Sequence, residues 1–577
     1  MIKNLSFPKT SLGLALFLFG LAFLIVAALF SNADYADYLL TAGTRDLSWG
    51  PTLFRTLLVF HGGLLVAFSL MTPMVGGEDG AEGADNSKRF ALSPKVIAAL
   101  ILMSVLGLIL RLWNLGTDLW IDEVFTLLDF VRKPLGDIVT SFPSQNQHML
   151  FSILARISTI IFGESAWSVR LPSVLFGIGS IWAFFFLCRR LLDTREALLG
   201  SALMTVSYHH IWFSQNARGY MGLLLFTLLA TWCWFVALEN NKVGWWLGYA
   251  ASIVLGMWVH PTMAFVVAAH VLVHFVLFAK PDLGGDRPLS PSPERRVGIR
   301  PFAAWLLSVT VTLQLYALAM PEFLAVGLHE ESRDSEWTNP IWVLTESLRS
   351  LSIGFSGIAI VLCGGAFVAF GWVMLFRRNR RAAVLMVLPA FLAGGTMLLL
   401  GHNIWPRFFF FSMGFGLLIV IHGAMELPKA VLAYLRSSSE TSISASRIGV
   451  GFALLLILVS LLTLPKNYAL PKQSFSAAKN YVETHRSPGD RFVAVSLAGI
   501  VYGDYLTPFW PVAKTGPELE TLQEGSGRVW LVYTLPIEVK AFRPELWSMI
   551  ENDYEIVQVF PGTLNGGEVF VCQRKIN

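Results

Sequence analysis

Two neighbouring carboxylates are the first candidates for catalysis in this sequence. Asp122 and Glu123 end the segment Asp-Leu-Trp-Ile-Asp-Glu at 118–123, directly after Trp120 and Ile121. Tryptophan and isoleucine are typical of a membrane–water interface and would hold the pair at the membrane surface. A carboxylate in that position is well placed to accept a proton from a substrate hydroxyl. The alternative is an ordinary solvated loop turn, because acidic residues are common in loops.

A second polar motif, Ser-Gln-Asn-Ala-Arg-Gly-Tyr at 214–220, separates two strongly apolar segments. Arg218 supplies a fixed cation, and Gln215, Asn216 and Tyr220 supply hydrogen-bond donors. A guanidinium group suits phosphate because its planar fork can bond two oxygens at once. The alternative is an arginine at a helix end that reaches the membrane interface.

A third motif, Gly-His-Asn-Ile-Trp-Pro-Arg at 401–407, precedes four phenylalanines at 408–411. Arg407 would lie beside aromatic rings at the lipid boundary, which suits a lipid-linked phosphate; the alternative is an interfacial anchor. Each further candidate is weak alone, but all of them fall on the same predicted face as the three motifs: His148, Arg170, His260 and His402.

The composition places most of the chain in a membrane. Of its 577 residues, 54% are hydrophobic and 14% are charged, whereas soluble domains carry about 25% charged residues. The net charge of +4 is small and scattered, so no nucleic-acid partner is expected. The four cysteines are widely separated, which argues against a disulfide framework. The apolar run at 11–30 exceeds the about 7–15 residues of a cleavable signal and predicts a retained span.

The topology depends on a short apolar stretch at 149–163, which contains Arg156. If this stretch does not span, the basic segments at 189–195, 280–300 and 377–381 all fall on the inner side, as the positive-inside rule requires. If it did span, all of them would reverse. We therefore expect an interfacial helix there, and about 13 spans, at 11–30, 51–74, 94–113, 168–188, 196–213, 219–238, 243–260, 262–279, 302–320, 353–376, 382–400, 407–425 and 447–464.

Three parts follow from this pattern. Residues 1–93 hold an extra pair of spans and a cytoplasmic loop, and residues 94–465 form a transmembrane core with a long outer loop at 114–167. Residues 466–577 regain charge and have apolar runs of strand length. With the N-terminus in the cytoplasm and an odd number of spans, this last part lies outside. The expected fold is an all-α multi-pass protein of the plasma (inner) membrane with a small C-terminal α/β extracytoplasmic domain.

The C-terminal domain has its own predicted elements. Two helices and four strands are predicted from the periodicity of apolar residues and from the content of β-branched and aromatic residues. The helices are expected at 477–485 and 545–552, and the strands at 491–501, 528–534, 554–560 and 568–573.

Three motifs of soluble enzymes are missing from the sequence. It contains no glycine-rich phosphate loop ending in Lys-Ser/Thr, no His-Glu-x-x-His and no nucleophile elbow. ATP hydrolysis and zinc proteolysis are therefore poorly supported, and the energy for any reaction must come with the substrate.

From residue 101 onward the chain resembles the GT-C superfamily of membrane glycosyltransferases, in particular the group around the protein O-mannosyltransferases and the lipid A aminoarabinose transferases. The resemblance covers about 101–465, and the tail at 472–490 is similar to the outer domain of bacterial members. The order and spacing of several motifs carry it: Arg111-Leu-Trp-Asn-Leu, Leu119-Trp-Ile-Asp-Glu, Gln147-His-Met-Leu-Phe, Phe162-Gly-Glu-Ser, Arg170-Leu-Pro-Ser-Val-Leu-Phe-Gly and Ser214-Gln-Asn-Ala-Arg-Gly-Tyr.

This resemblance implies inverting transfer of a sugar from a polyprenyl-phosphate donor at the outer leaflet. Asp122 would be the general base and Glu123 would help to orient the acceptor hydroxyl. Arg218 and Arg407, with Arg170 as a helper, would hold the departing phosphate. The acceptor could be a lipid, a polysaccharide or a protein, and neither it nor the sugar is identified by the sequence.

The chain departs from the family pattern in two places. Many relatives have an acidic residue shortly after the motif at 214–220, where it helps to bind a divalent metal, but 221–226 has none. An obligatory metal is therefore not expected. The two spans at 11–30 and 51–74 have no counterpart in the family core.

Two other classes of function stay open. A lipid or solute transporter would carry charges and broken helices within its spans, whereas here the charges gather at one surface. A non-catalytic membrane protein that binds glycan would tolerate a neutral residue at 122.

Overall fold

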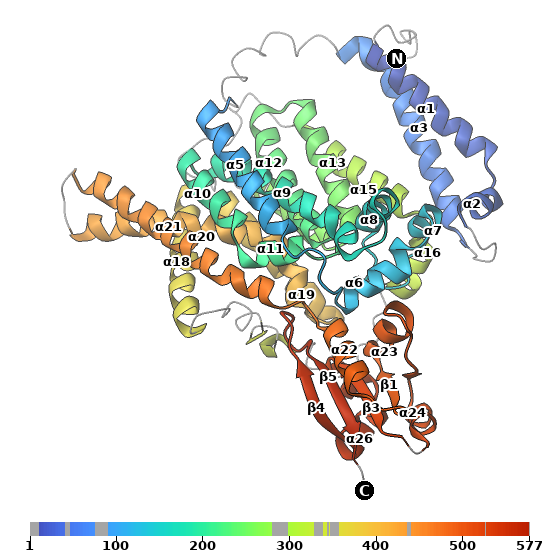
Figure 1. Cartoon of the computed structure of the whole chain (residues 1–577). Helices are drawn as coiled ribbons and strands as arrows, with labels where there is room; N and C mark the ends of the chain where they lie inside the picture. The colour runs from blue at the N-terminus through green and yellow to red at the C-terminus, as the bar shows by residue number, and fades with distance from the viewer. Residues whose placement is uncertain are drawn as a thin grey trace.

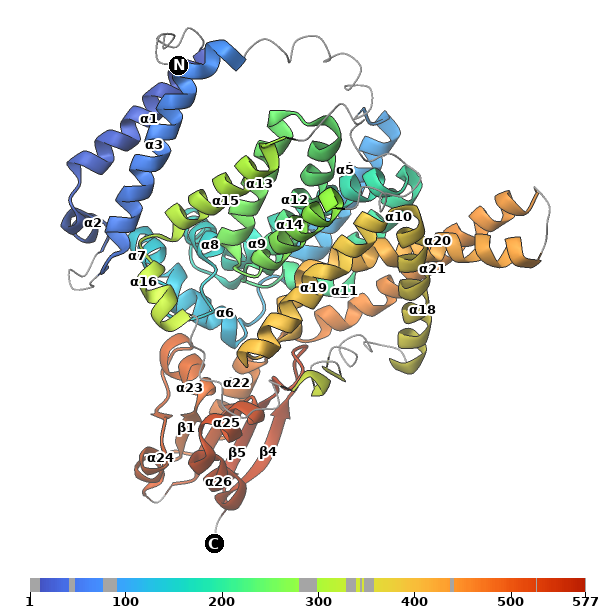
Figure 2. The ribbon, with the colours of Figure 1, turned by 180° about the vertical axis from the view of Figure 1, so that it is seen from behind.

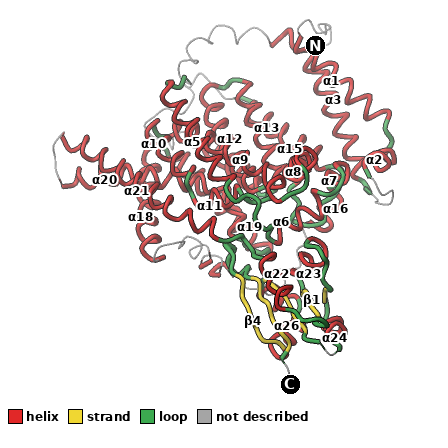
Figure 3. The backbone as a smooth tube through the Cα atoms, in the orientation of Figure 1, coloured by secondary structure: helices red, strands yellow, loops and turns green. Residues whose placement is uncertain are grey.

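The computed structural model describes residues 11–40, 47–75, 91–279, 298–327, 339–342, 345–346, 357–435, 440–525 and 527–575. Helices build the described chain up to Ala469, and the strands of the described part all lie in the C-terminal domain (Figures 1 and 3). The expected fold class is confirmed: the protein is a multi-pass helical membrane protein with a small C-terminal α/β domain. The basic loop at 280–297 and most of the acidic loop after Glu322 lie outside the described residues.

Seven described helices are long and apolar enough to cross a membrane, or eight if the bent pair at 13–39 is one span. The expected number of 13 therefore stays a prediction. Three of the expected spans, at 243–260, 262–279 and 302–320, form helices of 17 residues each, at the short end of the spanning range. The seven are Gly50–Leu70, Pro94–Leu112, Ala166–Leu191, Tyr220–Asn240, Arg380–Leu400, Pro406–Tyr434 and Ala445–Ala469.

The membrane core is a bundle around one central helix, α12 (Tyr220–Asn240), which packs against its neighbours α9 and α13. Its sequence is apolar all round. In its most apolar stretch 83% of the residues are buried, as expected of a helix enclosed by other helices. The bundle also contains α5 (Pro94–Leu112), α9 (Ala166–Leu191), α10 (Thr194–Thr205), α11 (Tyr208–Ser214), α13 (Val243–Val259), α14 (Met263–Ala279), α15 (Arg300–Tyr316), α18 (Gly357–Arg378), α19 (Arg380–Leu400), α20 (Met413–Leu435) and α21 (Glu440–Ala469).

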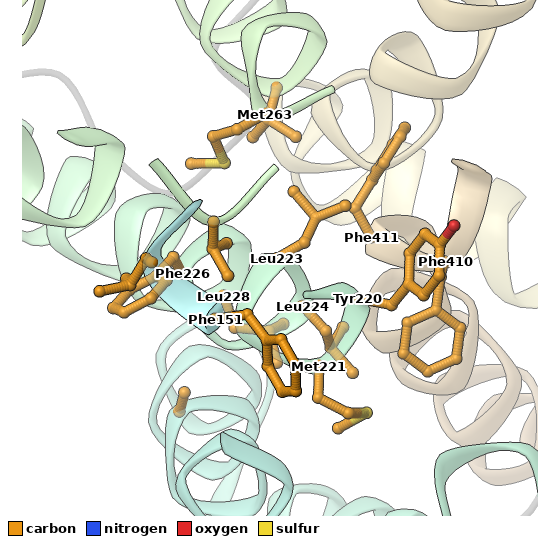
Figure 4. Close-up of a cluster of buried hydrophobic side chains, with 14 of the residues drawn as sticks. Phe151, Tyr220, Met221, Leu223, Leu224, Phe226, Leu228, Met263, Phe410 and Phe411 are labelled. Atoms are coloured by element: carbon orange, nitrogen blue, oxygen red, sulfur yellow. The ribbon is translucent and has the colours of Figure 1, made fainter. Parts of the chain in front are cut away.

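Side chains from several segments interlock along α12. Figure 4 shows Met221 and Leu224 of α12 in one apolar cluster with Phe151, Met263 and Phe410, which come from other segments. Close packing of this kind fixes the position of a helix, since interiors tolerate few voids. It therefore holds the start of α12, where the polar motif at 214–220 ends, in a defined place.

The extra N-terminal helices form a hairpin that stands apart from the bundle in both views (Figures 1 and 2). Helices α1 (Ser11–Leu29) and α3 (Gly50–Val75) are joined through α2 (Asn32–Leu39). They pack closely at Gly20 and Gly62, where an added Cβ on either glycine would lie 2.8 Å from the backbone oxygen of the other. The hairpin contacts the rest of the protein in two places: α3 packs against α15, and α2 packs against α7.

Short helices fill several of the connections between the long helices. Helix α8 has only 14 residues, fewer than the about 20 that a span needs, which fits the interfacial helix expected at 149–163. The others are α6 (Ile121–Phe125), η2 (Thr126–Val131), α7 (Leu135–Thr140), α16 (Met320–Glu322), η4 (Phe323–Gly327) and η6 (Pro406–Ser412), and α8 itself covers Met149–Phe162.

The C-terminal domain contains a five-stranded sheet in the order β2-β1-β3-β5-β4. Strand β1 is parallel to β2 and β3, and β5 is antiparallel to β3 and β4. Strands β1 (Arg491–Val495), β3 (Val529–Thr534), β4 (Tyr554–Phe560) and β5 (Val569–Arg574) and helices α22 (Phe475–His485) and α26 (Pro544–Asp553) confirm predicted elements; β2 (Val512–Ala513), α23 (Leu497–Ile500), η7 (Val501–Tyr505), α24 (Gly516–Gln523) and α25 (Pro536–Phe542) were not predicted.

The predicted strand at 491–501 is wrong in its second half. Strand β1 ends at Val495 because Ser496 adopts a φ of 53°, which turns the chain out of the sheet. Helix α23 follows directly, and it packs with η7 against α6 of the membrane core. An apolar run can suit a strand or a buried helix equally well, so periodicity alone did not reveal this turn.

Candidate active site

The three polar motifs that lie far apart in the sequence meet at the Asp122 carboxylate. Oδ2 of Asp122 lies 3.4 Å from Nη2 of Arg407 and 4.0 Å from Nη2 of Arg218. Asp122 is carried by α6, Arg218 by the turn before α12 and Arg407 by η6. Helix packing thus brings one carboxylate and two guanidinium groups into a single site, as the sequence suggested.

The guanidinium group of Arg218 donates hydrogen bonds to neutral groups. Its Nη1 donates to the hydroxyl of Thr126 at 3.2 Å and to the backbone oxygens of Asn146 and Asp122 at 3.3 and 3.4 Å. The side chain is 2% exposed. A buried cation with mostly neutral partners retains its capacity to bind an anion.

Arg407 is surrounded by aromatic rings. Its guanidinium carbon is 4.5 Å from the ring centre of Trp405, 5.8 Å from that of Trp120 and 6.0 Å from that of Phe408. The side chain is 24% exposed, more than that of Arg218. Stacking on aromatic faces fixes the guanidinium plane without neutralising its charge.

Glu123 forms a buried bidentate ion pair with Arg170. Oε1 accepts from Nε of Arg170 at 2.8 Å and Oε2 accepts from Nη2 at 2.6 Å. Oε1 also accepts from the backbone N–H of Ala217 at 2.6 Å. Burial raises the pKa of Glu123, but the charges of Arg170 and Lys472 and these hydrogen bonds outweigh it, so the pKa is lowered. Glu123 is therefore an ionised anchor between α6 and the motif at 214–220.

Arg170 also fixes the backbone that leads to α6. Its Nη1 donates to the oxygens of Leu115 and Thr117, and Nη2 donates to that of Asp118, all at 2.8 Å. The sequence suggested that Arg170 helps to hold a phosphate, but the structure commits its guanidinium to Glu123 and these carbonyls. Its geometry favours a role in positioning the segment 115–123.

Another expected binding residue, Gln215, makes its hydrogen bonds inside the protein. Nε2 of Gln215 donates to the backbone oxygens of Arg111 at 3.1 Å and Trp113 at 2.6 Å, which ties the motif at 214–220 to the end of α5. His402 lies at the end of α19, where its backbone N–H donates to the oxygen of Met397 at 3.0 Å.

Several polar atoms at the site are buried without a hydrogen-bond partner in the described structure. Buried polar groups are nearly always hydrogen-bonded in folded proteins, so polar atoms grouped at one place are available to bind a ligand or water. These atoms are Oδ2 of Asp122, Nε2 of His148, Nδ2 of Asn216, Nε of Arg218 and the hydroxyl of Tyr220.

A possible cation site lies elsewhere. Within the described ranges, one group of three His, Cys, Asp or Glu side chains has ligand atoms within 4.8 Å of one another: Glu196, His422 and Glu426. They belong to α10 and α20, which lie away from α6 in Figures 1 and 2. Nδ1 of His422 and Oε2 of Glu196 are 2.8 Å apart, and Nζ of Lys429 lies 2.6 Å from Oε1 of Glu426, so the cluster is already paired.

The linker to the C-terminal domain contributes residues that sequence reasoning missed. Gln473 is fully buried; its Oε1 accepts from the N–H of Ile121 at 2.9 Å, and its Nε2 donates to Thr534 in β3 at 2.9 Å. Both carboxylate oxygens of Asp118 accept from Ser476, from its N–H and its hydroxyl, at 2.8 Å. The C-terminal domain thus holds both ends of the segment that leads to Asp122.

Lys472, in the same linker, is a buried amine that donates to the backbone oxygen of Gln215. Burial lowers the pKa of Lys472 to about 7, although the negative charge of Glu123 raises it in part. Lys472 and Gln215 are separated by 257 residues. No local sequence signal connects residues so far apart.

Part of the chain matches a known family. Residues 146–283 match the family model described as "Dolichyl-phosphate-mannose-protein mannosyltransferase". The expected resemblance is confirmed. The matched segment contains His148, Arg170, Arg218 and His260.

One curated relative is YkcB of Bacillus subtilis (strain 168), which is named as a candidate mannosyltransferase. It is 33% identical to this chain over 122 residues, which are 21% of this chain and 16% of YkcB. The chain therefore spans about a sixth of the length of the curated relative that it matches.

Solved structures of membrane transferases are also similar. ArnT from Cupriavidus metallidurans in the apo state aligns with 82% of this chain and 97% of its own, at 12% identity and a TM-score of 0.43. The apo oligosaccharyltransferase of Archaeoglobus fulgidus aligns with 78% of this chain and 71% of its own, at 14% identity and a TM-score of 0.47.

Proposed function

We propose that this protein is an inverting glycosyltransferase that moves a sugar from a polyprenyl-phosphate donor to an acceptor hydroxyl at the outer face of the plasma membrane. The observation that carries the proposal is the meeting of Asp122 with Arg218 and Arg407 among buried polar atoms that lack partners. The description of the matched family, which names dolichyl-phosphate-mannose, supports a polyprenyl-phosphate donor.

Each group has a distinct task in the proposed reaction. Asp122 takes the proton of the acceptor hydroxyl, and the acceptor oxygen forms a bond to the anomeric carbon from the face opposite the phosphate. The bond from the anomeric carbon to the phosphate oxygen breaks, and its electron pair leaves with the polyprenyl phosphate. Arg218 and Arg407 stabilise the negative charge that develops on this leaving group.

Asp122 is better suited than Glu123 to act as the general base. Both oxygens of Glu123 accept hydrogen bonds from Arg170, and the backbone adds more, so this carboxylate has little remaining capacity. Oδ2 of Asp122 is near two guanidinium groups but accepts no hydrogen bond in the described structure. A bound donor phosphate would share the charge of both arginines and leave this oxygen of Asp122 free to accept from the acceptor hydroxyl.

The proposed orientation, with the N-terminus cytoplasmic and the C-terminal domain outside, is supported by the distribution of arginines. Nη2 of Arg378 donates to the oxygen of Leu192 at 3.2 Å, so the arginine-rich ends of α9 and α18 lie together. The C-terminal domain instead contacts the segment 118–121. Basic residues favour the cytoplasmic side, which would place the Asp122 site on the outer side.

A comparison of cells with and without the gene tests the function. Mass spectrometry of lipids and envelope glycans should show one sugar modification lost and its polyprenyl-phosphate-sugar donor accumulated. The wild-type gene should restore the modification, and an Asp122→Asn gene should not. Unchanged glycans and lipids under conditions of expression would contradict the proposal. The class of the lost glycan would show whether the acceptor is lipid, polysaccharide or protein.

A further inference from the structure

Three buried rings form a wall beside Arg218. The ring centres of His148 and His260 are 4.8 Å apart, and that of Tyr220 lies 5.4 Å from His148 and 5.3 Å from His260. The guanidinium carbon of Arg218 lies 5.8 Å from the Tyr220 ring centre. The three residues come from the start of α8, the start of α12 and the end of α13, and are 1%, 1% and 5% exposed for His148, Tyr220 and His260.

Two apolar rings pack against this wall. Phe408 lies 6.1 Å from the His260 ring centre, and Phe213 packs edge-on against Tyr220 at 5.6 Å. Figure 4 shows Tyr220 at the border of the apolar cluster, beside Phe410. The wall, defined here as His148, Tyr220 and His260, is therefore a polar surface within apolar surroundings, adjacent to one of the proposed phosphate ligands.

The hydrogen-bonding capacity of the wall is partly unused. Nδ1 of His148 is 3.2 Å from the backbone oxygen of Val259, which can only accept, so Nδ1 carries the proton and Nε2 is an acceptor. That Nε2 and the Tyr220 hydroxyl have no hydrogen-bond partner among the described residues. Nδ1 of His260 accepts from the N–H of Thr262 at 3.2 Å, so its Nε2 carries the proton and is a donor.

This set of one acceptor, one donor and one hydroxyl matches the hydroxyl groups of a sugar. A sugar hydroxyl both donates and accepts, and rings beside it cover its apolar C–H faces. An apolar ligand would leave the buried polar atoms of the wall unsatisfied, at a cost in affinity.

The charges around the wall restrict which sugar fits. Burial, together with the positive charges of Arg218 and Arg407, lowers the pKa of His260 to about 3 and that of His148 well below its usual range, so both imidazoles are neutral. In the described part of the chain, Arg218 and Arg407 are the charged side chains that lower the pKa of both His148 and His260. A nearby carboxylate, Asp122, is paired with the same arginines.

Asp122, Arg218 and Arg407 together carry one surplus positive charge, which the single negative charge of a phosphodiester balances. A neutral sugar preserves this balance. A sugar with an ammonium group would add a second positive charge in a buried place, and burying an unpaired charge is costly.

We propose that His148, Tyr220 and His260 form the sugar subsite of the donor site, and that this subsite takes an uncharged, hydroxyl-rich sugar and rejects an amino sugar. The inference rests on the proposed function, because it takes Arg218 and Arg407 as ligands of the donor phosphate.

Binding of three lipids to the purified full-length protein tests the inference. The lipids are undecaprenyl phosphate, the same lipid carrying a hexose, and the same lipid carrying a 4-amino-4-deoxypentose. Wild-type protein should bind the hexose lipid about tenfold more tightly than bare undecaprenyl phosphate. The aminopentose lipid should bind no more tightly than the bare lipid.

Two variants locate the subsite. Tyr220→Phe and His148→Phe should each remove most of the preference for the hexose lipid and keep the affinity for bare undecaprenyl phosphate. Tyr208→Phe is the matched control, since it removes a hydroxyl from another buried tyrosine outside the site, and it should keep the preference. Retained affinity for the bare lipid shows that each variant is folded.

The possible outcomes separate the two proposals. If none of the three lipids binds, the proposed function fails. If the lipids bind but the hexose gives no gain in affinity, or the gain survives in both wall variants, the sugar subsite is wrong. If the aminopentose lipid binds most tightly, the assignment of an uncharged sugar is wrong while the lipid-phosphate site stands.

Discussion

Gln473, in the linker to the C-terminal domain, accepts a hydrogen bond at 2.9 Å from the backbone N–H of Ile121, 352 residues earlier in the chain. Ile121 is the first residue of α6, and the next residue is the candidate base Asp122. The same Gln473 side chain donates to Thr534 and to the oxygen of Gly567. The C-terminal domain is thereby attached to the helix that carries the candidate base.

Gln473→Ala should lower kcat about tenfold with little change in the KM for the lipid donor. The substitution leaves the N–H of Ile121 without its partner and loosens α6, but it does not touch Arg218 or Arg407. Steady-state kinetics on membranes or purified protein would measure the effect. Gln558→Ala, at an exposed glutamine of β4, is the control and should match wild type. Equal kcat values for the two variants would refute the positioning role.

Asp122→Asn should abolish transfer, with a loss of at least about a hundredfold, because an amide cannot take the acceptor proton. Asparagine has nearly the same size, so expression and membrane insertion should stay normal. Asp129→Asn, at an exposed carboxylate on the adjoining η2, is the control and should keep activity. Wild-type activity in Asp122→Asn would exclude Asp122 as the base.

Arg407→Lys should raise the KM for the lipid donor about tenfold or more. Lysine keeps the charge but loses both the bidentate fork and the stacking on Trp405. Arg486→Lys is a matched control, since Arg486 also stacks on a ring, that of Phe492 at 5.5 Å, but lies in the C-terminal domain. Donor titrations with both variants would measure the change. An unaltered KM in Arg407→Lys would argue against phosphate binding by this residue.

Glu123→Gln should destabilise the protein by about 3–5 kcal/mol, because it leaves Arg170 charged and buried without its partner. Thermal unfolding in detergent at neutral pH would detect the loss. Glu164→Gln is the control: Glu164 pairs with Arg132 at 2.8 Å, but its side chain is 44% exposed. A pair this exposed contributes about 0–1 kcal/mol. Similar unfolding temperatures in the two variants would show that the buried pair contributes little.

The same carboxylate predicts a pH dependence of stability. The pKa of Glu123 is lowered from 4.5 in the folded protein, so the unfolded chain binds a proton at a higher pH than the folded one. The stabilisation is therefore complete above about pH 4.5 and is lost as the pH falls through the lower folded value. Wild-type unfolding temperatures should drop more steeply below pH 4.5 than those of Glu123→Gln. Parallel curves would contradict this assignment.

The rate of transfer should show no titration of the wall histidines near pH 6.5. His260 has a pKa of about 3, so it stays neutral from pH 5 to 8. A profile of kcat against pH should have the same shape for wild type and for His260→Asn over this range, although the rate of the variant is lower. An acidic limb near pH 6.5 that disappears in the variant would show that His260 titrates during catalysis.

The amino-acid sequence by itself determined the elements of this protein. Long apolar runs predict helices in a membrane, and the return of charge after residue 465 predicts a separate α/β domain. Placement of arginines predicted that the segments carrying Asp122, Arg218 and Arg407 share one face. These features are local or additive along the chain, and for that reason they can be read without a fold.

Only the tertiary structure decided which polar groups meet at the site and which are already hydrogen-bonded within the protein. Glu123 and Asp122 are neighbours in sequence, yet one is bound by Arg170 while the other faces Arg218 and Arg407. The partners of Ile121 and Gln215 come from the linker, 352 and 257 residues later. Contacts over such separations arise from the packing of whole helices and domains, and no periodicity or motif within one segment encodes them.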